Sequence, residues 1–362
     1  MSPSYPLTST MTSVSDARRS EILASPQFGR HFTEHMVTAV WTIEDGWHER
    51  AVGPLEPFAL HPGTAALHYA QEIFEGLKAY RHADGGVFLF RPEANAQRFA
   101  RSAERLALPQ LTEEDFLASV EALIRVDQRW VPTPTSEESL YLRPFMFAAD
   151  EFLGIRPPER VIYSVIAWPT GPLFASGHNG VTLWVSSRYT RSAPGGTGGA
   201  KCGGNYAASF AAQIEAQQHG CDQVMYLDRI GGEGNLEESG TMNLCLVTAS
   251  GHLITPALGT ILEGVTRDAI LTLAADHALT PMERTISLDE LRSGVADGGF
   301  TEAFAAGTAA VITPIVGFKG EGYAFTVGAG TPGKRTMALR DQLLGIQYGR
   351  VADHHGWMRR VL

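Results

Sequence analysis

The sequence predicts a two-domain α/β protein. Its 362 residues suffice for two domains with complete hydrophobic cores. Strand and helix patterns are mixed along both halves of the chain, and a stretch at 169–180 (PTGPLFASGHNG) that is rich in Pro, Gly and Ser separates them. We therefore expect a tail at 1–25, a small α/β domain at 26–170, a linker at 171–182 and a larger domain at 183–362.

Local patterns justify the individual elements, beginning at the N-terminus. Residues 36–43 (MVTAVWTI) are rich in β-branched and aromatic side chains, which favours a strand. Asp84-Gly85 lies between apolar runs and predicts a tight hairpin over 76–90. Pro92 suits the first turn of a helix over 91–108. The remaining elements are expected as strands at 140–147, 161–168 and 181–187, a helix at 206–219, strands at 223–227 and 241–247, and helices at 266–277 and 336–348.

Composition and charge argue against several classes of function. The hydrophobic fraction of 44% and the charged fraction of 19% are ordinary for a soluble globular protein. A formal charge of -10 argues against sequence-independent nucleic-acid binding, which needs clustered Lys and Arg. The three cysteines (Cys202, Cys221 and Cys245) lack the spacing of a disulfide framework or a metal site, so we expect no metal and a reducing compartment. No targeting signal or apolar run of ~20 residues is evident, which predicts a cytoplasmic protein.

The most informative segment is the glycine-rich run around Lys201 (GGTGGAKCGGNYA, 195–207). Glycines let a ligand approach the backbone closely, and a lysine held in such a slot can lose its proton and become a nucleophile. A phosphate-binding loop would need Gly directly before the lysine and Ser or Thr directly after it. Ala200 and Cys202 occupy those places, so the segment favours a Schiff-base lysine instead.

A Schiff-base lysine indicates pyridoxal phosphate or a keto substrate, and pyridoxal phosphate needs three further groups. Its ring nitrogen needs a carboxylate, its phosphate a helix N-terminus and a cation, and its ring oxygen a hydrogen-bond donor. Candidates are the two carboxylates in 235–243 (NLEESGTMN), the helix start at 264–268 (GVTRD), the backbone at 307–310 (GTAA), and Tyr206. None of these signals is specific alone, but together they are consistent with one cofactor.

With these motifs in place, the chain resembles the fold-type IV pyridoxal-phosphate enzymes, and more closely the branched-chain aminotransferases shared by actinobacteria and eukaryotes. The resemblance runs from Phe28 to the C-terminal helix. Its most specific segments are FGRHFTEHM (28–36), LHYAQEIFEGLKAY (67–80), RPEANAQRFARSAERLALP (91–109), LYLRPFMF (140–147), GGAKCGGNYA (198–207), GCDQVMYLD (220–228), EESGTMN (237–243), GVTRD (264–268) and GTAAVITP (307–314). The resemblance implies a small N-terminal and a larger C-terminal α+β domain, pyridoxal 5'-phosphate as cofactor, and a homodimer.

The resemblance also implies a role for each matching residue. Lys201 would hold the cofactor and shuttle the proton, and Glu238, rather than its neighbour Glu237, would face the ring nitrogen. The ring oxygen would be bound by Tyr206, and the phosphate by Arg98, Val265, Thr266 and Thr308. The substrate pocket would be formed by Phe28, Tyr69, Phe74 and Tyr141, by Arg143 for the side-chain carboxylate of glutamate or 2-oxoglutarate, and by the amides of Thr308 and Ala309 for the α-carboxylate. The substrates would be L-leucine, L-isoleucine and L-valine, with 2-oxoglutarate as acceptor.

Two positions depart from relatives of this type. Ala310 and Thr313 stand where mammalian relatives carry a Cys-x-x-Cys pair, so a thiol switch of that kind is not expected. Leu173 replaces a tyrosine that some relatives place in the interdomain loop over the pocket.

Alternative interpretations remain open from the residues alone. The fold would also suit a D-amino-acid aminotransferase or an aminodeoxychorismate lyase, and a phosphate- or nucleotide-binding module without covalent chemistry is a remote alternative. Periodicity alone makes Tyr69, Phe74 and Tyr141 ordinary core aromatics. Arg98, Arg101 and Arg105 share one helix face, which predicts solvent exposure for the last two. Arg143 lies in an apolar strand and therefore needs a carboxylate from the protein or a ligand. The pattern His31-Phe32-Thr33-Glu34-His35 matches a zinc-protease motif by chance, since no helix is expected there.

Overall fold

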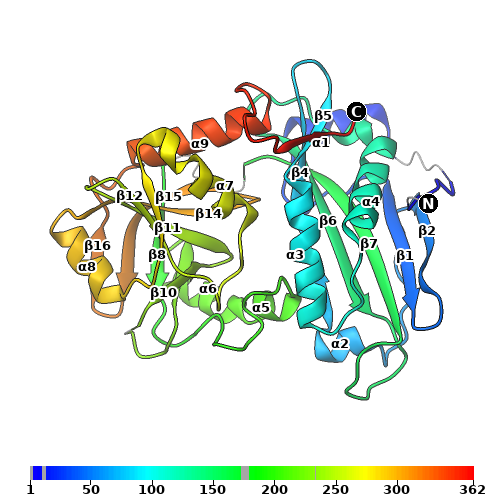
Figure 1. Ribbon diagram of the computed structural model, residues 1–362, viewed down its shortest axis with the longest axis horizontal. Coiled ribbons are helices and arrows are strands. Elements are labelled where there is room, and N and C mark those ends of the chain that lie inside the picture. The colour runs from blue at the N-terminus through cyan, green and yellow to red at the C-terminus, as the bar shows by residue number, and fades with distance from the viewer. Residues whose placement is uncertain (1–2, 10–13, 173–178, 233) are drawn as a thin grey trace. The chain divides into compact units, whose positions relative to one another are not determined.

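A computed structural model describes residues 3–9, 14–172, 179–232 and 234–362 (Figure 1). The chain forms two compact units. Unit 1 comprises Met1–Leu173, Ala200–Gly203 and Gly345–Leu362, and unit 2 comprises Phe174–Gly199 and Gly204–Leu344. Two segments expected in the larger domain, Ala200–Gly203 and Gly345–Leu362, thus pack with unit 1. The linker at 171–182 includes 173–178, outside the described residues, and the expected domain division stays a prediction.

Unit 1 is built on one antiparallel sheet with the strand order β17-β5-β4-β6-β7-β1-β2, in which β3 also pairs with β6. The strands are β1 (His35–Thr42), β2 (Gly46–Pro54), β3 (Glu72–Phe74), β4 (Leu77–Arg81), β5 (Val87–Phe90), β6 (Ser139–Ala148), β7 (Arg160–Thr170) and β17 (Met358–Arg360). Its longest strands, β6 and β7, pair over ten residues from Ser139↔Thr170 to Ala148↔Val161. This pairing fixes which side chains share a face of the sheet.

Unit 1 also contains helices (Figure 1). They are α1 (Asp16–Ala24), α2 (Ala65–Tyr69), α3 (Pro92–Arg105), α4 (Glu113–Val126) and the short η1 (Gln128–Trp130). Among them, α2, α3 and α4 contact this sheet. The hydroxyl of Thr112 caps α4 by accepting a hydrogen bond from the amide of Asp115. In α4, Phe116, Val120 and Leu123 repeat at helical spacing and are fully buried. They pack with Phe99 of α3 in the core of unit 1.

Unit 2 contains a second, mixed sheet with the order β10-β9-β8-β15-β14-β11-β12-β13, and β16 pairs with β15. Because β10 also pairs with β11, the strands β10, β9, β8, β15, β14 and β11 close into a ring. The strands are β8 (Val181–Val185), β9 (Gln223–Leu227), β10 (Leu236–Ser239), β11 (Met242–Thr248), β12 (His252–Thr255), β13 (Thr280–Glu283), β14 (Phe300–Gly307), β15 (Val311–Gly320) and β16 (Tyr323–Thr326). The helices are α5 (Gly203–Ala207), α6 (Ser209–Gln218), α7 (Val265–Leu273), η2 (Ala274–His277), α8 (Leu288–Ala296) and α9 (Lys334–Gln347).

The predicted α+β class is confirmed, and so are most of the predicted elements. The strand at 36–43, the hairpin over 76–90 and the helix over 91–108 correspond to β1, to β4 and β5, and to α3. The single helix predicted at 206–219 is wrong in one respect, because it is divided at Ala208 into α5 and α6. Within the described ranges, no helix is long and apolar enough to cross a membrane.

Candidate active site

Lys201 is held by backbone hydrogen bonds to two elements of unit 1. Its amide donates to the hydroxyl of Ser102 on α3 (2.9 Å), and its carbonyl accepts from the amide of Phe74 on β3 (3.0 Å). The next residue, Cys202, forms a β-bridge with Ile73. The loop that carries Lys201 is therefore fixed against β3 and α3, while the lysine side chain extends from it.

The surroundings of the Lys201 amine favour its neutral form. Burial lowers the pKa of Lys201 to about 8, and the charge of Arg98 acts in the same direction. Arg143 also lowers this pKa, whereas Glu75 and Tyr141 raise it. The Nζ atom lies 4.9 Å from the centre of the Phe74 ring. An amine with this pKa has a useful neutral fraction near neutral pH, as a nucleophilic lysine requires.

Arg98 is part of a buried ion pair beside Lys201. Its Nε lies 2.6 Å from Oε1 of Glu75, and its Nη2 lies 2.8 Å from Oε2. Glu75 also accepts from Asn95 Nδ2 (2.8 Å) and from the Gly76 amide (3.0 Å). Burial alone would raise the pKa of Glu75, but Arg98 and the other donors hold it below its usual value. Arg98 is thus buried, whereas Arg101 and Arg105 on the same helix are exposed, as predicted.

Aromatic side chains of unit 1 form a cluster around Arg143. Phe28 contacts Tyr141 edge-on (centroids 5.0 Å apart) and Trp168 (5.3 Å), and Tyr141 stacks on Trp168 (4.8 Å). The guanidinium carbon of Arg143 lies 4.6 Å from the Phe74 ring centre, 5.7 Å from Tyr141 and 5.4 Å from Trp168. The structure therefore brings together Phe28, Phe74, Tyr141 and Arg143 from the predicted pocket.

Trp168 is a member of this cluster that the sequence analysis does not identify. It lies on β7 directly opposite Tyr141 of β6. Cross-strand partners in an antiparallel pair have neighbouring side chains, so the pairing of the two predicted strands would have indicated it. Tyr69, in contrast, has a different environment. It ends α2, is 48% exposed, and donates its hydroxyl to the carbonyl of Leu153 (2.6 Å).

Glu238 is the centre of a separate polar cluster in unit 2. The carboxylate is buried, and its Oε2 lies 2.5 Å from Nε of Arg191. Its Oε1 accepts from Asn243 Nδ2 and from the amide of Leu262, both at 3.0 Å. Asn243 leaves no room for a side chain at position 264, because a Cβ atom there would lie 2.0 Å from its Oδ1. Charge and hydrogen bonds therefore fix the Glu238 carboxylate in one position.

Glu237, the adjacent carboxylate, has a different environment. It is also buried, but burial raises its pKa, and the charge of Glu238 adds to this effect, although Thr260 and Arg191 oppose it. Burial therefore works against the charged form of Glu237. The difference supports Glu238 as the carboxylate that carries charge.

The remaining predicted cofactor and substrate residues also belong to unit 2. Val265 and Thr266 form the first turn of α7, and the N-terminus of a helix suits an anion. Thr308 and Ala309 lie in the tight turn between β14 and β15. Tyr206 lies on α5. Leu173, which was noted as a departure near the pocket, lies outside the described residues.

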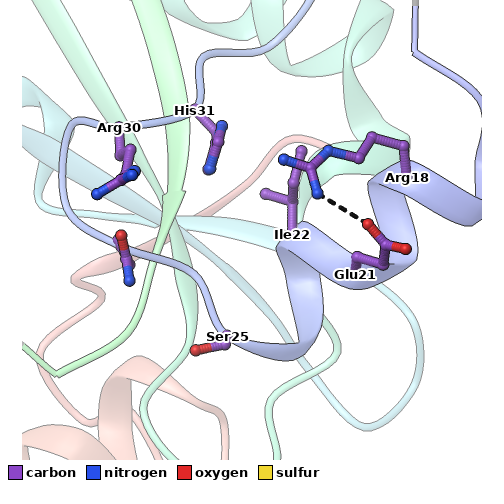
Figure 2. Close-up of a pocket in the computed structure, with 7 residues that line it drawn as sticks. Arg18, Glu21, Ile22, Ser25, Arg30 and His31 are labelled. Carbon is purple, nitrogen blue, oxygen red and sulfur yellow. Dashed lines mark hydrogen bonds and ion pairs between the residues drawn. The ribbon is translucent and has the colours of Figure 1, made fainter.

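Unit 1 contains a pocket of about 280 Å³ beside α1 (Figure 2). It is lined by Arg18, Glu21, Ile22, Ser25, Gln27, Arg30 and His31. Arg18 and Glu21 form an ion pair of 2.8 Å across its rim. The zinc-like pattern at 31–35 forms no helix, and its second histidine, His35, pairs with Asp127 through Nδ1 (2.7 Å) while Glu34 pairs with Arg129. Among the residues that the structure describes, no group of three or more His, Cys, Asp or Glu side chains is arranged to hold a metal ion.

Comparison with known proteins assigns the family. The model of the amino-transferase class IV family matches residues 72–318, so the chain belongs to the class IV aminotransferases. The branched-chain-amino-acid aminotransferase of Mycolicibacterium smegmatis is 52% identical over 350 residues, which span 96% of this chain and 95% of that protein. A probable branched-chain-amino-acid aminotransferase of Streptomyces coelicolor is 50% identical over 360 residues, 99% of each chain. These relatives place the chain among the branched-chain-amino-acid aminotransferases.

Solved structures agree with this assignment. The branched-chain amino acid aminotransferase of Escherichia coli matches with a TM-score of 0.75 and 28% identity, and covers 91% of this chain and 100% of its own. The T.th. branched-chain amino acid aminotransferase with pyridoxamine 5'-phosphate matches with a TM-score of 0.72 and 28% identity, over 90% of this chain and 98% of its own. The predicted family, fold and enzyme class are therefore confirmed.

The cofactor of this family is pyridoxal 5'-phosphate, and the residues of this chain fit it. Unit 1 supplies an amine whose neutral form is favoured, on a rigidly held loop. Unit 2 supplies a buried carboxylate fixed by Arg191, and a helix N-terminus suited to a phosphate group. Each unit therefore carries groups of the kind that this cofactor needs.

Proposed function

We propose that this chain transfers the amino group of L-leucine, L-isoleucine or L-valine to 2-oxoglutarate, with Lys201 as the catalytic residue. The observation that carries the proposal is the lowered pKa of the Lys201 amine on its fixed loop, in a chain about half identical to branched-chain-amino-acid aminotransferases. The bound cofactor supplies an electron-withdrawing ring that stabilises negative charge at the substrate α-carbon.

Lys201 has two tasks in this proposal. Its neutral amine would hold the cofactor until the substrate amine takes its place. The freed amine would then accept the proton of the substrate α-carbon and donate it to the C4′ carbon of the cofactor. Both tasks need an amine that is neutral at working pH and a side chain that can move. The backbone bonds to Ser102 and Phe74 hold the loop and leave the side chain to do this.

Glu238 would face the ring nitrogen of the cofactor, and its negative charge would favour the protonated form of that nitrogen. Arg191, Asn243 and the Leu262 amide orient this carboxylate. We assign the remaining cofactor contacts to Tyr206 at the ring oxygen and to Arg98, Val265, Thr266 and Thr308 at the phosphate.

The substrate contacts follow from the aromatic cluster. Phe28, Tyr69, Phe74 and Tyr141 would provide apolar walls for a branched side chain, and Arg143 would receive the second carboxylate of glutamate or 2-oxoglutarate. Stacking on aromatic rings supports this role, because it holds a guanidinium while its N–H groups can still reach a carboxylate. The amides of Thr308 and Ala309 would bind the α-carboxylate.

The proposal extends to the assembly and the compartment. We propose a homodimer in the cytoplasm, on the basis of the family resemblance and of three free, buried cysteines among the described residues. Light scattering behind a sizing column would measure a mass near twice 39.2 kDa. A mass of one chain would reject the dimer.

The decisive test is the visible absorption spectrum of the purified protein, loaded with pyridoxal phosphate, before and after L-leucine is added. The wild type and the matched control Lys334→Ala, which changes a lysine at the start of α9, are expected to show a band that leucine converts to the pyridoxamine form. Lys201→Ala is expected to show no such turnover. A band that answers D-alanine and ignores L-leucine would favour a D-amino-acid aminotransferase. The absence of any band would exclude covalent cofactor chemistry.

A further inference from the structure

We infer that Glu72 is a specificity-determining residue, which weakens the attraction of Arg143 for acidic substrates and thereby balances acidic against branched aliphatic ones. The inference rests on the proposed function, because it takes Arg143 as the group that receives the second carboxylate. Glu72 is then a protein carboxylate that competes with the substrate for the guanidinium of Arg143.

The register of the sheet places Glu72 and Arg143 on the same face. β3 pairs antiparallel with β6, with Glu72 opposite Phe147 and Phe74 opposite Phe145. Alternate residues of a strand share a face, so Glu72 and Phe74 lie on the face that also carries Phe145 and Arg143. The guanidinium carbon of Arg143 lies 4.6 Å from the Phe74 ring centre, which confirms this orientation. Phe74 is thus flanked by Glu72 on its own strand and by Arg143 on the next.

Arg143 lacks a contact partner for its charge within the part of the chain that is described. Its Nε is buried without a hydrogen-bond partner, and aromatic rings surround its guanidinium. A partly buried guanidinium is costly unless a negative charge compensates it. The nearby carboxylate of Glu75 is already taken by Arg98 through two hydrogen bonds. The carboxylate left to compensate Arg143 is that of Glu72, whose pKa burial raises overall, although the Gly203 amide and the charge of Arg143 both favour the charged form.

The Glu72 carboxylate acts on Arg143 through its charge, and no ion pair between the two is found among the described residues. The Gly203 amide hydrogen-bonds to this carboxylate. The approach is so close that a Cβ atom on residue 203 would lie 1.6 Å from Oε1 of Glu72, so a larger residue there would displace this carboxylate. This hydrogen bond ties Glu72 to the loop of Lys201, because Gly203 follows Lys201 by two residues. It compensates Arg143 at a distance, and the N–H groups of Arg143 are left for a substrate.

This arrangement has opposite consequences for the two kinds of substrate. When a branched aliphatic side chain fills the pocket, Glu72 supplies the negative charge that keeps Arg143 stable beside it. When 2-oxoglutarate binds, its second carboxylate meets Arg143 but is repelled by Glu72. Removing the charge of Glu72 should therefore strengthen acidic ligands and leave aliphatic ones unchanged or slightly weakened.

The test uses two unreactive substrate analogues, glutarate and 4-methylpentanoate, titrated calorimetrically into the cofactor-loaded protein. In Glu72→Gln, which keeps an oxygen for the Gly203 amide, the Kd of glutarate is expected to fall about three- to tenfold, as removal of one partly screened like charge implies. The Kd of 4-methylpentanoate should change by less than about twofold. The control Glu104→Gln, an exposed carboxylate on α3, should change neither. KM values for 2-oxoglutarate and for the 2-oxo acid of leucine should follow the same pattern.

Two results would overturn the inference. If the Kd values of both analogues change equally in Glu72→Gln, Glu72 only shapes the pocket. If the Kd of glutarate rises, Glu72 positions Arg143 and does not compete with its ligand. If Glu72→Gln fails to fold, Glu72→Ala is expected to lower the Kd of glutarate as well. An unchanged Kd of glutarate in Glu72→Ala would also reject the inference.

Arg143→Gln separates the inference from the proposed function. If glutarate binding in Arg143→Gln equals that of the wild type, the role proposed for Arg143 is wrong. If Arg143→Gln weakens glutarate but Glu72→Gln has no effect, only the present inference fails. In the double variant the effect of Glu72 should disappear, because its influence acts through the charge of Arg143.

Discussion

The cluster around Lys201 in unit 1 disfavours the charged form of its central residue. The cluster around Glu238 in unit 2 favours the charged form of its own. The Lys201 amine is placed where burial and two arginine charges disfavour its ionised form, with Glu75 and Tyr141 only partly opposing them. The Glu238 carboxylate instead receives one arginine and two N–H donors, which stabilise its ionised form. The surroundings of Lys201 weaken the charged form of the residue, and those of Glu238 stabilise it.

The difference matches the tasks proposed for the two residues. Lys201 sits on a loop that is fixed through its backbone, by Ser102 and Phe74, as suits a side chain that must leave one partner and reach another. The side chain of Glu238 is itself anchored at both oxygens, as suits a group that must hold a constant charge throughout the reaction. Anchoring should therefore make Glu238 important for stability and activity, and Lys201 important for activity alone.

The largest effect is expected for Lys201→Ala. Loss of the nucleophile and proton carrier should lower kcat by at least about 10³-fold. Because the site disfavours the charged amine, the free energy of unfolding at pH 7 should stay within about 1 kcal/mol of the wild type or increase. Steady-state assays and urea unfolding measure the two quantities. A variant that loses several kcal/mol of stability would contradict the contrast drawn between the clusters.

Glu238→Ala should reduce activity and stability together. It leaves the buried Arg191 without the carboxylate at 2.5 Å and the Leu262 amide without an acceptor. Breaking a buried ion pair in this way costs about 3–5 kcal/mol. Urea unfolding of Glu238→Ala beside the exposed control Glu104→Ala measures the difference. A loss similar to that of the control would mean that the anchoring contributes little.

The pKa of the Lys201 amine gives a third test of the contrast. In cofactor-free protein, the rate of covalent capture of pyridoxal phosphate should rise with pH through about 8, because only the neutral amine reacts. The charge of Glu75 raises the pKa of this amine, so Glu75→Gln should move the midpoint to lower pH. The capture rate across pH, followed by absorbance, measures both midpoints. A midpoint near the usual lysine value would show that the surroundings do not favour the neutral amine.

The sequence predicted much of this organisation, for reasons that differ between residues. Lys201 was identifiable because the glycines around it and the failed phosphate-loop spacing are local features. Local patterns also predicted β1, α3 and the β4–β5 hairpin. Trp168 and Arg191 were not identified, because each acquires its role only through a residue distant in the chain. Trp168 stacks on Tyr141 through strand pairing, and Arg191 pairs with Glu238 on a different element of unit 2.

The division of the predicted helix at 206–219 has a similar cause. Its sequence carries no proline and reads as one continuous helix, yet α5 ends at Ala207 and α6 begins at Ser209. Asn205 on α5 is bonded to Thr197 of the glycine-rich run, with Oδ1 2.7 Å from the Thr197 hydroxyl and Nδ2 2.9 Å from its carbonyl. These tertiary bonds tie α5 to the loop, and a helical periodicity cannot reveal them.

The smallest effect is expected for Glu237→Gln, and it sharpens the comparison within two adjacent residues. Burial and the charge of Glu238 raise the pKa of Glu237 and so work against its charge, and an amide keeps the size and polarity of this side chain. The substitution should change kcat/KM by less than about twofold and the free energy of unfolding by less than about 1 kcal/mol. Glu238→Gln, measured in parallel, removes a charge that Arg191 compensates and should lower kcat at least about tenfold. Equal losses in the two variants would mean that position in the strand, and not the charge fixed by Arg191, decides which carboxylate serves the reaction.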